Sequence, residues 1–209
     1  TVSVGGQTAQ PSSGLLTYAA PIIEDIAISS NDGSSDLMDI ELMPPQNFPT
    51  FGGTLVDITG INFPPINAGV DIESILHVSY GPTGSDFNAL NCRVIQDGMV
   101  IRCEVAPGYG ANHYWRVNVA ELVSGLSPVK TSYLQPSINT CFGPACLKSS
   151  TAGGQLLVLF GQNLFGPLEY VVYGSGTGTL YTASCTVLKP HVALACLTAP
   201  GTGKSHKWT

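Results

Sequence analysis

The sequence predicts an all-β protein made of sandwich domains, and three features support this fold class. Gly and Pro are frequent, at 24 and 15 of the 209 residues, and they interrupt the chain at short intervals. The apolar runs between them alternate with polar residues and are rich in Val, Leu, Ile and Thr, as in TLVDITG, QLLVLFG and WRVNV. Such runs are typical of short strands joined by turns. The third feature is an internal repeat.

The composition provides enough apolar material for one large or two ordinary domains with buried cores. Hydrophobic residues make up 44% of the chain and charged residues only 11%, which argues against a disordered tail. No window contains the roughly 18 consecutive apolar residues of a membrane span, so we expect none. The chain does not open with a charged and then apolar signal peptide, so we expect a mature or excerpted segment.

The net charge of -6 is unevenly distributed. Residues 21–135 hold thirteen acidic and four basic side chains, a charge of -9, whereas residues 136–209 hold one acidic and four basic side chains, a charge of +3. Opposite charges on the two parts could steer head-to-tail contact between chains. The alternative is that the two surfaces are simply solvated differently, with no partner implied.

The internal repeat has a fixed spacing. Six cysteines fall in three local pairs, which are Cys92 and Cys103, Cys141 and Cys146, and Cys185 and Cys196. The first and third pairs each span eleven residues and lie 93 residues apart. The same offset relates Tyr80 to Tyr173, Pro107 to Pro200, His113 to His206, and Trp115 to Trp208. Upstream, GGTLVDITGINF matches GGQLLVLFGQNLF at another offset, because the second copy is eight residues shorter before Tyr173. Two homologous domains are therefore predicted.

The first residues of the chain extend this repeat. Val2, Val4, Tyr18, Pro21 and Ile23 lie 115 residues before Val117, Val119, Tyr133, Pro136 and Ile138. Residues 1–20 therefore resemble the last two strands of a domain. Thr1 and Thr209 both align with the position of Arg116 in the complete copy. We expect three parts: a strand pair at 1–20 that complements a preceding unit, a complete domain at 21–135, and an incomplete domain at 136–209.

The ordered motifs resemble the IPT/TIG family of immunoglobulin-like domains, which occurs in plexins, fibrocystin-like surface proteins and many exoproteins. The motifs are PTFGGTLVDITGINF, a cysteine pair, APGYG, WRVNV and SPVKTSYLQPSI. The resemblance covers nearly the whole chain and implies tandem seven-stranded sandwiches that act as spacers or binding modules, with no catalytic residues. The second copy departs from the first at CFGPAC, where the first has the insertion SSNDGSSDLMDIELMPPQNFP.

The cysteine pairs are predicted to form disulfides. No CxxC motif occurs, and CFGPAC has neither a second pair nor a His at ligand distance, so a zinc site is disfavoured. Each bond would close a small loop and stabilise its domain by about 2 to 4 kcal/mol. Three pairs imply an oxidising compartment, so we expect an extracellular or cell-surface protein.

We expect neither catalysis nor a cofactor. No GxSxG motif is present, and no Gly-rich stretch has the strand-to-helix context of a phosphate loop, since no helix is evident. His113 and His206 occupy equivalent positions, so we expect a shared structural role, such as a turn or strand-edge hydrogen bond. The charge of -9 on the complete copy would repel DNA or RNA, so nucleic acid is not expected as a partner.

Two surface features remain open at this point. The acidic stretch Asp32–Glu41 could bind calcium, although it lacks the order of ligands of an EF-hand, and the alternative is a solvated acidic loop. No Asn-x-Ser/Thr sequon exists, so ordinary N-glycans are not expected. The runs TAQPSS, SSNDGSS and KSSTAGG could carry O-linked sugar.

These features favour a homopolymeric extracellular filament. A sandwich without its last two strands exposes sheet edges and part of its core. We expect residues 1–20 of one unit to add strands to the second domain of its neighbour, repeated head to tail. The residues expected in this contact are Val2, Val4, Leu16, Tyr18 and Trp208. Successive units could be separate chains or parts of one covalent array. The alternative is an excerpt of a cell-surface receptor or adhesin that binds protein or glycan ligands.

Overall fold

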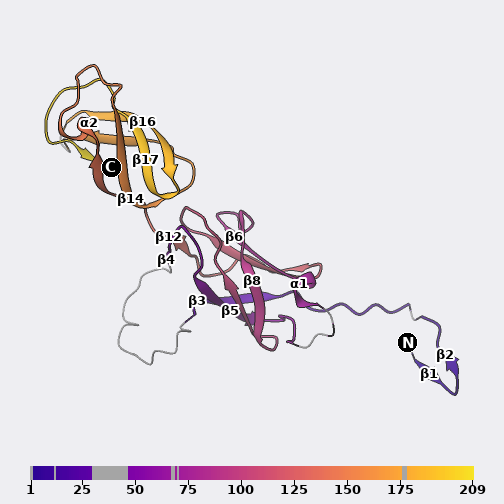
Figure 1. The fold of residues 1–209 in the computed structure, drawn as a ribbon. Helices are drawn as coiled ribbons and strands as arrows, with labels where there is room; N and C mark the ends of the chain where they lie inside the picture. Colours follow the sequence, from indigo (N-terminus) through magenta and orange to yellow (C-terminus); the bar gives the residue numbers. More distant parts are fainter. Residues whose placement is uncertain (1, 12, 30–46, 67–68, 70, 176–177) are drawn as a thin grey trace, which may run out of the picture.

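The protein is almost entirely β-structure. The computed structural model describes residues 2–11, 13–29, 47–66, 69, 71–175 and 178–209, and the acidic stretch Asp32–Glu41 considered above for calcium lies outside them. Figure 1 shows two β-rich bodies in series, with the N-terminal segment extending from the first of them. The buried hydrophobic residues likewise form two clusters, one in each body.

The first body has two facing layers of antiparallel strands. One sheet has the order β3-β5-β9-β8, formed by Ile22–Ile28, Leu55–Ile61, Val100–Glu104 and Leu90–Gln96. The other has the order β11-β10-β6-β7, formed by Leu122–Val123, Tyr114–Val119, Leu76–Gly81 and Phe87–Asn88. A short parallel pair joins β12 (Ser132–Tyr133) to β4 (Asn47–Phe48).

Alternation along β5 shows how the sequence specifies this sandwich. Val56 and Ile58 point into the core and are fully buried. Burial of each such side chain contributes about 1.5 to 3 kcal/mol. Asp57 lies on the outer face directly opposite Arg102 of β9, and the two form an ion pair with Nε–Oδ1 at 2.6 Å. The period of two therefore separates the core face from a charged outer face.

A glycine pair allows the chain to enter β5. Gly52 and Gly53 have φ angles of 77° and 85°, which side-chain-bearing residues rarely adopt. A Cβ on Gly52 would lie 2.6 Å from the carbonyl oxygen of Val105. The equivalent residues Gly153 and Gly154 have φ angles of 72° and 73°, so the same turn precedes β5 in the first body and β14 in the second.

The second body contains one six-stranded sheet that bends into two layers. Its order is β13-β14-β17-β16-β15-β18, formed by Ser137–Phe142, Leu156–Leu164, His191–Leu197, Leu180–Lys189, Val171–Gly174 and Lys207–Trp208. The long strand β16 pairs with β17 along Ser184–Lys189 and with β15 along Leu180–Ala183. It therefore passes from one layer to the other.

The described residues include two short helices, although none is evident from the sequence. Helix α1 spans Ile72–Ile75 before β6, and helix α2 spans Pro144–Leu147 after β13. Each has only four residues, which is too short for a periodic apolar pattern to reveal it. None of the helices among the described residues is long and apolar enough to cross a membrane.

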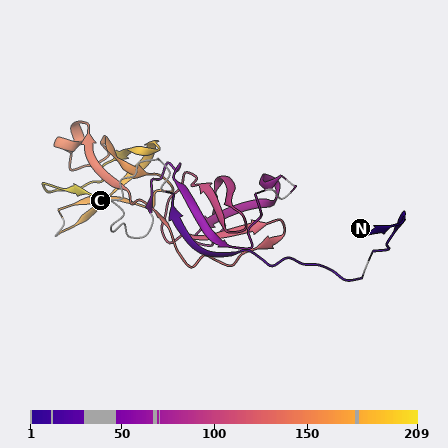
Figure 2. The ribbon, with the colours of Figure 1, turned by 90° about the horizontal axis from the view of Figure 1, so that it is seen from below.

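The N-terminal segment, described for residues 2–11 and 13–20, extends away from the first body. It begins with a hairpin in which β1 (Ser3–Val4) pairs with β2 (Gln7–Thr8), and it then runs to β3 as an irregular chain. Figures 1 and 2 both place this hairpin and the C-terminal body at opposite ends of the molecule, with the first sandwich between them. The hairpin and β18 therefore do not meet within one chain.

Candidate interaction site between units

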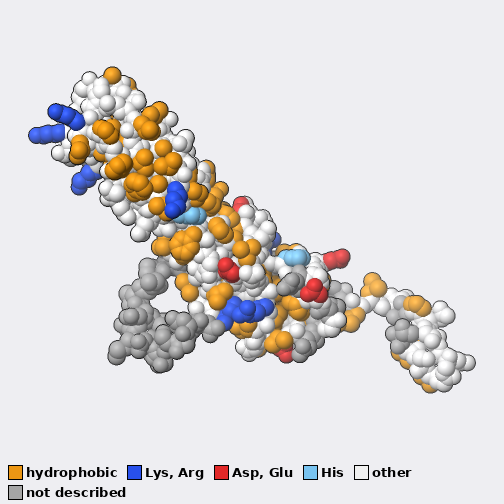
Figure 3. Space-filling model, in the orientation of Figure 1, with side chains coloured by type: hydrophobic (Ala, Val, Ile, Leu, Met, Phe, Trp, Pro, Cys, Tyr) orange, Lys and Arg blue, Asp and Glu red, His pale blue; other side chains and the backbone are white. Residues whose placement is uncertain are grey.

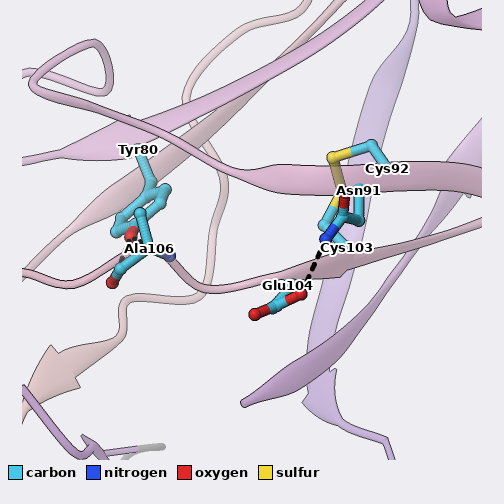
Figure 4. Close-up of a disulfide and its surroundings, with 6 residues drawn as sticks. All are labelled: Tyr80, Asn91, Cys92, Cys103, Glu104 and Ala106. Atoms are coloured by element: carbon cyan, nitrogen blue, oxygen red, sulfur yellow. Dashed lines mark hydrogen bonds between the residues drawn. A yellow bond between two sulfur atoms is a disulfide. The ribbon is translucent and has the colours of Figure 1, made fainter. Parts of the chain in front are cut away.

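The three expected cysteine pairs are disulfide-bonded. Cys185 and Cys196 are direct cross-strand partners in β16 and β17, with Cα atoms 4.0 Å apart. Figure 4 shows the corresponding Cys92–Cys103 bond, where the Cα–Cα distance is 4.1 Å, and the adjacent hydrogen bond from Asn91 to Glu104 at 2.8 Å. Both bonds hold paired strands of one sheet at the same position in the repeat.

The third disulfide lies beside an open part of the second body. Cys141 of β13 is bonded to Cys146 of α2, with Cα atoms 5.8 Å apart. The bond attaches α2 to the sheet, and Ala145 of α2 is buried against the second core. Helix α2 and the residues after it thereby form one side of a groove.

An aromatic cluster closes the equivalent region of the first sandwich. Tyr80 stacks on Trp115 with ring centroids 4.3 Å apart, and Tyr133 of β12 is buried in the same core against Phe87 and His113. The Tyr133 hydroxyl is 2.6 Å from the Tyr80 hydroxyl and donates to the carbonyl oxygen of Ala106 at 2.6 Å. Burial, together with the neighbouring Tyr80 hydroxyl, raises the pKa of Tyr133 well above its ordinary value. The hydroxyl pair therefore stays protonated at physiological pH.

His113 is part of the same cluster, and it makes the expected strand-edge hydrogen bond through its backbone and not through its side chain. Its backbone pairs with Thr131 in an isolated bridge, as a strand-edge residue should. Its imidazole, only 1% exposed, instead packs among Tyr80, Phe87 and Tyr133, with centroid distances of 5.5 to 6.1 Å. Burial lowers the pKa of His113. The ring is thus an aromatic packing group, which residue type alone did not indicate.

The described part of the second sandwich has the equivalents of Tyr80 and Trp115, but no tyrosine in the place of Tyr133. Tyr173 lies against Trp208 with centroids 4.5 Å apart, and its hydroxyl donates to the carbonyl oxygen of Ala199 at 3.1 Å. Among the described residues, no ring of a following strand lies over this pair. The result is a groove of about 410 Å³ between residues 145–151 and 198–206, with Tyr181 on its wall. We call it the acceptor groove.

The residues predicted for contact between units lie at the two ends of the chain. Val2, Val4, Leu16 and Tyr18 are exposed on the N-terminal segment, and Trp208 is half-buried beside the acceptor groove. The structure does not bring the four N-terminal residues into contact with Trp208. Sequence reasoning missed Tyr181 and Gly201 in the groove, although the offset of 93 from Gly108 points to Gly201.

The two sandwiches also contact each other directly. The hydroxyl of Thr50 lies 2.8 Å from Nδ1 of His191, the first residue of β17. Phe165 stacks on His191 with centroids 4.3 Å apart, and its ring is 6.4 Å from that of Tyr109. These contacts connect one end of the first sandwich to one end of the second. Across the described residues, no group of three or more His, Cys, Asp or Glu side chains is placed to hold a metal ion.

Comparisons with known proteins identify no family. No family model matches the chain, and no curated protein matches it. One similar solved structure is the plexin A4 full extracellular region, domains 1 to 10, at 21% identity and a TM-score of 0.32, covering 78% of this chain and 13% of that one. Another is SGBP-B from a complex xyloglucan utilization locus in Bacteroides uniformis, at 17% identity and a TM-score of 0.34, covering 91% of this chain and 45% of that one. The chain thus spans less than half the length of either structure.

Proposed function

We propose that the chain is a non-enzymatic structural unit of an extracellular fibre, built from IPT/TIG-type sandwiches joined head to tail. In this arrangement the N-terminal segment of one unit adds strands to the second sandwich of its neighbour. The disulfides support an oxidising location, since such bonds persist outside the cytosol. Exposed Ser and Thr of the N-terminal segment are suited to O-linked sugar on the fibre surface.

One observation carries this proposal: the N-terminal hairpin has the same register as a hairpin of the first sandwich. Ser3 pairs with Thr8 and Val4 with Gln7, whereas Asn118 pairs with Val123 and Val119 with Leu122. Each residue of the first hairpin lies 115 positions before its counterpart. The next hydrogen bond also matches, because the amide of Ala9 donates to Val2 and that of Ser124 donates to Val117, both at 2.8 Å. The hairpin therefore has the shape of a β10–β11 pair before it joins any sheet.

The distribution of charge supports a head-to-tail contact. Lys148 and Lys204 line the acceptor groove at the far end of the second sandwich. Figure 3 shows Lys and Arg side chains gathered at that end, and acidic side chains on the first sandwich toward the N-terminal segment. Asp97 and Glu121 are exposed on turns of the first sandwich. Opposite charges on the two ends favour repeated contact in one orientation.

Sedimentation velocity and electron microscopy of the 209-residue chain test the proposal. We expect rods that lengthen as protein concentration rises, with an axial repeat of two sandwiches. A denaturing gel then distinguishes separate chains, which migrate as monomers, from a covalent array in the native material, which migrates as a very large species. A chain that stays monomeric up to about 100 µM, a concentration far above the Kd of a stable interface, would contradict the proposal.

A further inference from the structure

We infer that the acceptor groove of the second sandwich is a socket for the Tyr18 side chain of a neighbouring unit, and that Tyr181 partly covers this socket until Tyr18 enters. The inference rests on the proposed function and specifies its contact. The occupant is a second copy of this chain, because the N-terminal segment and the groove lie at opposite ends of one molecule.

The first sandwich shows how such a tyrosine is held. Tyr133, 3% exposed, lies across Gly108, whose missing side chain leaves room for the ring. Its amide donates to the carbonyl oxygen of Gly110 at 2.9 Å, and the amide of Leu134 donates to Phe48 at 2.8 Å. The strand is therefore fixed on both sides of the buried ring by backbone hydrogen bonds.

Each of these partners has a counterpart in the groove. Gly201 and Gly203 stand 93 residues after Gly108 and Gly110, and Ala199 occupies the place of Ala106. Two backbone bonds of the walls also repeat: Gly108 donates to Thr50 at 2.9 Å, and Gly201 donates to Thr151 at 3.0 Å. A tyrosine that enters here would find the same carbonyl acceptor and the same space beside a glycine.

Tyr18 fits this socket by position and by exposure. It lies 115 residues before Tyr133 and is 78% exposed. Leu15 and Leu16 beside it are also exposed, so this part of the segment presents apolar surface with no cover among the described residues. Leu16 takes the position of Thr131, whose hydroxyl accepts from the Trp115 indole at 2.9 Å. Leu16 has no hydroxyl, so this one hydrogen bond would be lost, and an apolar contact of the Leu16 side chain would take its place.

The hairpin would continue the sheet next to the socket. In the first sandwich Val117 of β10 stands opposite Val78 of β6. In the second sandwich Thr209 exchanges hydrogen bonds with Val172. By the same register Val2 would stand opposite Val171, one residue further along β15. Among the described residues, Val171 has a strand partner only on its β16 side.

Tyr181 occupies part of the socket in the single chain. Tyr181 pairs with Tyr173 as Phe87 pairs with Tyr80, so the two residues hold equivalent strand positions. Unlike Phe87, Tyr181 has a hydroxyl, which donates to the carbonyl oxygen of Thr202 at 2.9 Å and accepts from its amide at 3.2 Å. Its ring lies 2.7 Å from the position of a Cβ on Gly201. Tyr18 must therefore displace the Tyr181 ring from its place beside Gly201.

Disulfide trapping in the full chain tests the register. Val117 bonds through its backbone to Ser124 and not to β6, so the equivalent Val2–Val171 pair is of the non-hydrogen-bonded type, whose side chains are closest. A chain with Val2→Cys and Val171→Cys should form reducible multimers on a non-reducing gel. The control carries Val2→Cys and Val172→Cys, whose side chain faces the opposite side of β15. Absence of multimers from the first variant, or equal multimers from both, would overturn the inference.

Two further variants test the socket itself. Because Tyr18 is exposed in the single chain, Tyr18→Ala should leave the fold unchanged while weakening association by at least about 30-fold, as for a buried aromatic anchor. Tyr181→Phe removes the two hydrogen bonds to Thr202 and should strengthen association by at least about 3-fold. Association that is unaffected by Tyr18→Ala would overturn the inference.

The outcomes separate this inference from the proposed function. Rods that form normally with Tyr18→Ala and give no trapped disulfide would keep the fibre and overturn the socket. If the chain stays monomeric, a synthetic peptide of residues 1–20 provides the decisive measurement. Quenching or enhancement of Trp208 fluorescence by that peptide, but not by a peptide with Tyr18→Ala, would support the socket although the fibre has failed. Identical responses to both peptides would overturn the socket as well.

Discussion

At the scale of single residues, His113 shows how a titratable group can belong to the aromatic core of the first sandwich. Burial among three rings lowers the pKa of His113, so its neutral form is favoured in the folded state. The unfolded chain binds a proton near pH 6.5, the ordinary value for His. The stabilising contribution is therefore complete above about pH 6.5 and is lost as the pH falls through that value toward the lower pKa of the folded state.

We accordingly predict that the first sandwich loses stability as the pH falls below about 6.5, by at most about 1.4 kcal/mol per pH unit. His113→Phe should remove most of this dependence, since a Phe ring suits the same aromatic surroundings. The measurement is urea unfolding followed by Trp115 fluorescence in a Trp208→Phe background. Asp86 is the charged group that acts on His113. Hydrogen bonds from Thr83 lower the pKa of Asp86, so Asp86 stays ionised near pH 6.5. If stability depends equally on pH in the parent protein and in the His113→Phe variant, this role of His113 is contradicted.

At the scale of elements, the turn before β5 depends on a backbone conformation that only glycine adopts easily. Gly52→Ala should lower the free energy of unfolding by about 1 to 3 kcal/mol, because φ is 77° and the added Cβ would meet the carbonyl of Val105. Gly125→Ala is the matched control, since nothing lies within 4 Å of a Cβ there, and we expect a change within about 0.5 kcal/mol. Urea unfolding of both variants checks this, and a similar loss in both would refute it.

At the scale of the whole molecule, separation of charge predicts that association depends on salt. Raising NaCl from about 20 mM to about 500 mM should weaken association, because the Debye length shortens to a few ångströms. Lys148→Glu with Lys204→Glu should weaken association at low salt and flatten the salt dependence, since both lysines line the acceptor groove. Sedimentation velocity at several salt concentrations measures both effects. A salt dependence that survives the double charge reversal would locate the electrostatic contact elsewhere.

How far the sequence could anticipate this protein differs between the fold and the candidate site. Alternating patterns and fixed offsets predict the strands, and the three cysteine pairs are bonded as the spacing suggests. The short helices α1 and α2 escape such reasoning, because four residues give no usable periodicity. The packing of His113 and the position of Tyr181 over Gly201 escape it too, since both depend on contacts between residues that are distant in sequence.

The sequence by itself determined the β-class, the repeated positions and the equivalence of Tyr18 with Tyr133, because period and offset are properties of the chain. Only the tertiary structure decided which of the repeated tyrosines is buried. Tyr133 folds back onto its own sandwich, where Gly108 leaves room for its ring. Tyr18 has the equivalent position in the repeat, but no sandwich among the described residues lies within its reach. Burial requires a partner surface in space, and residue order alone does not contain that information.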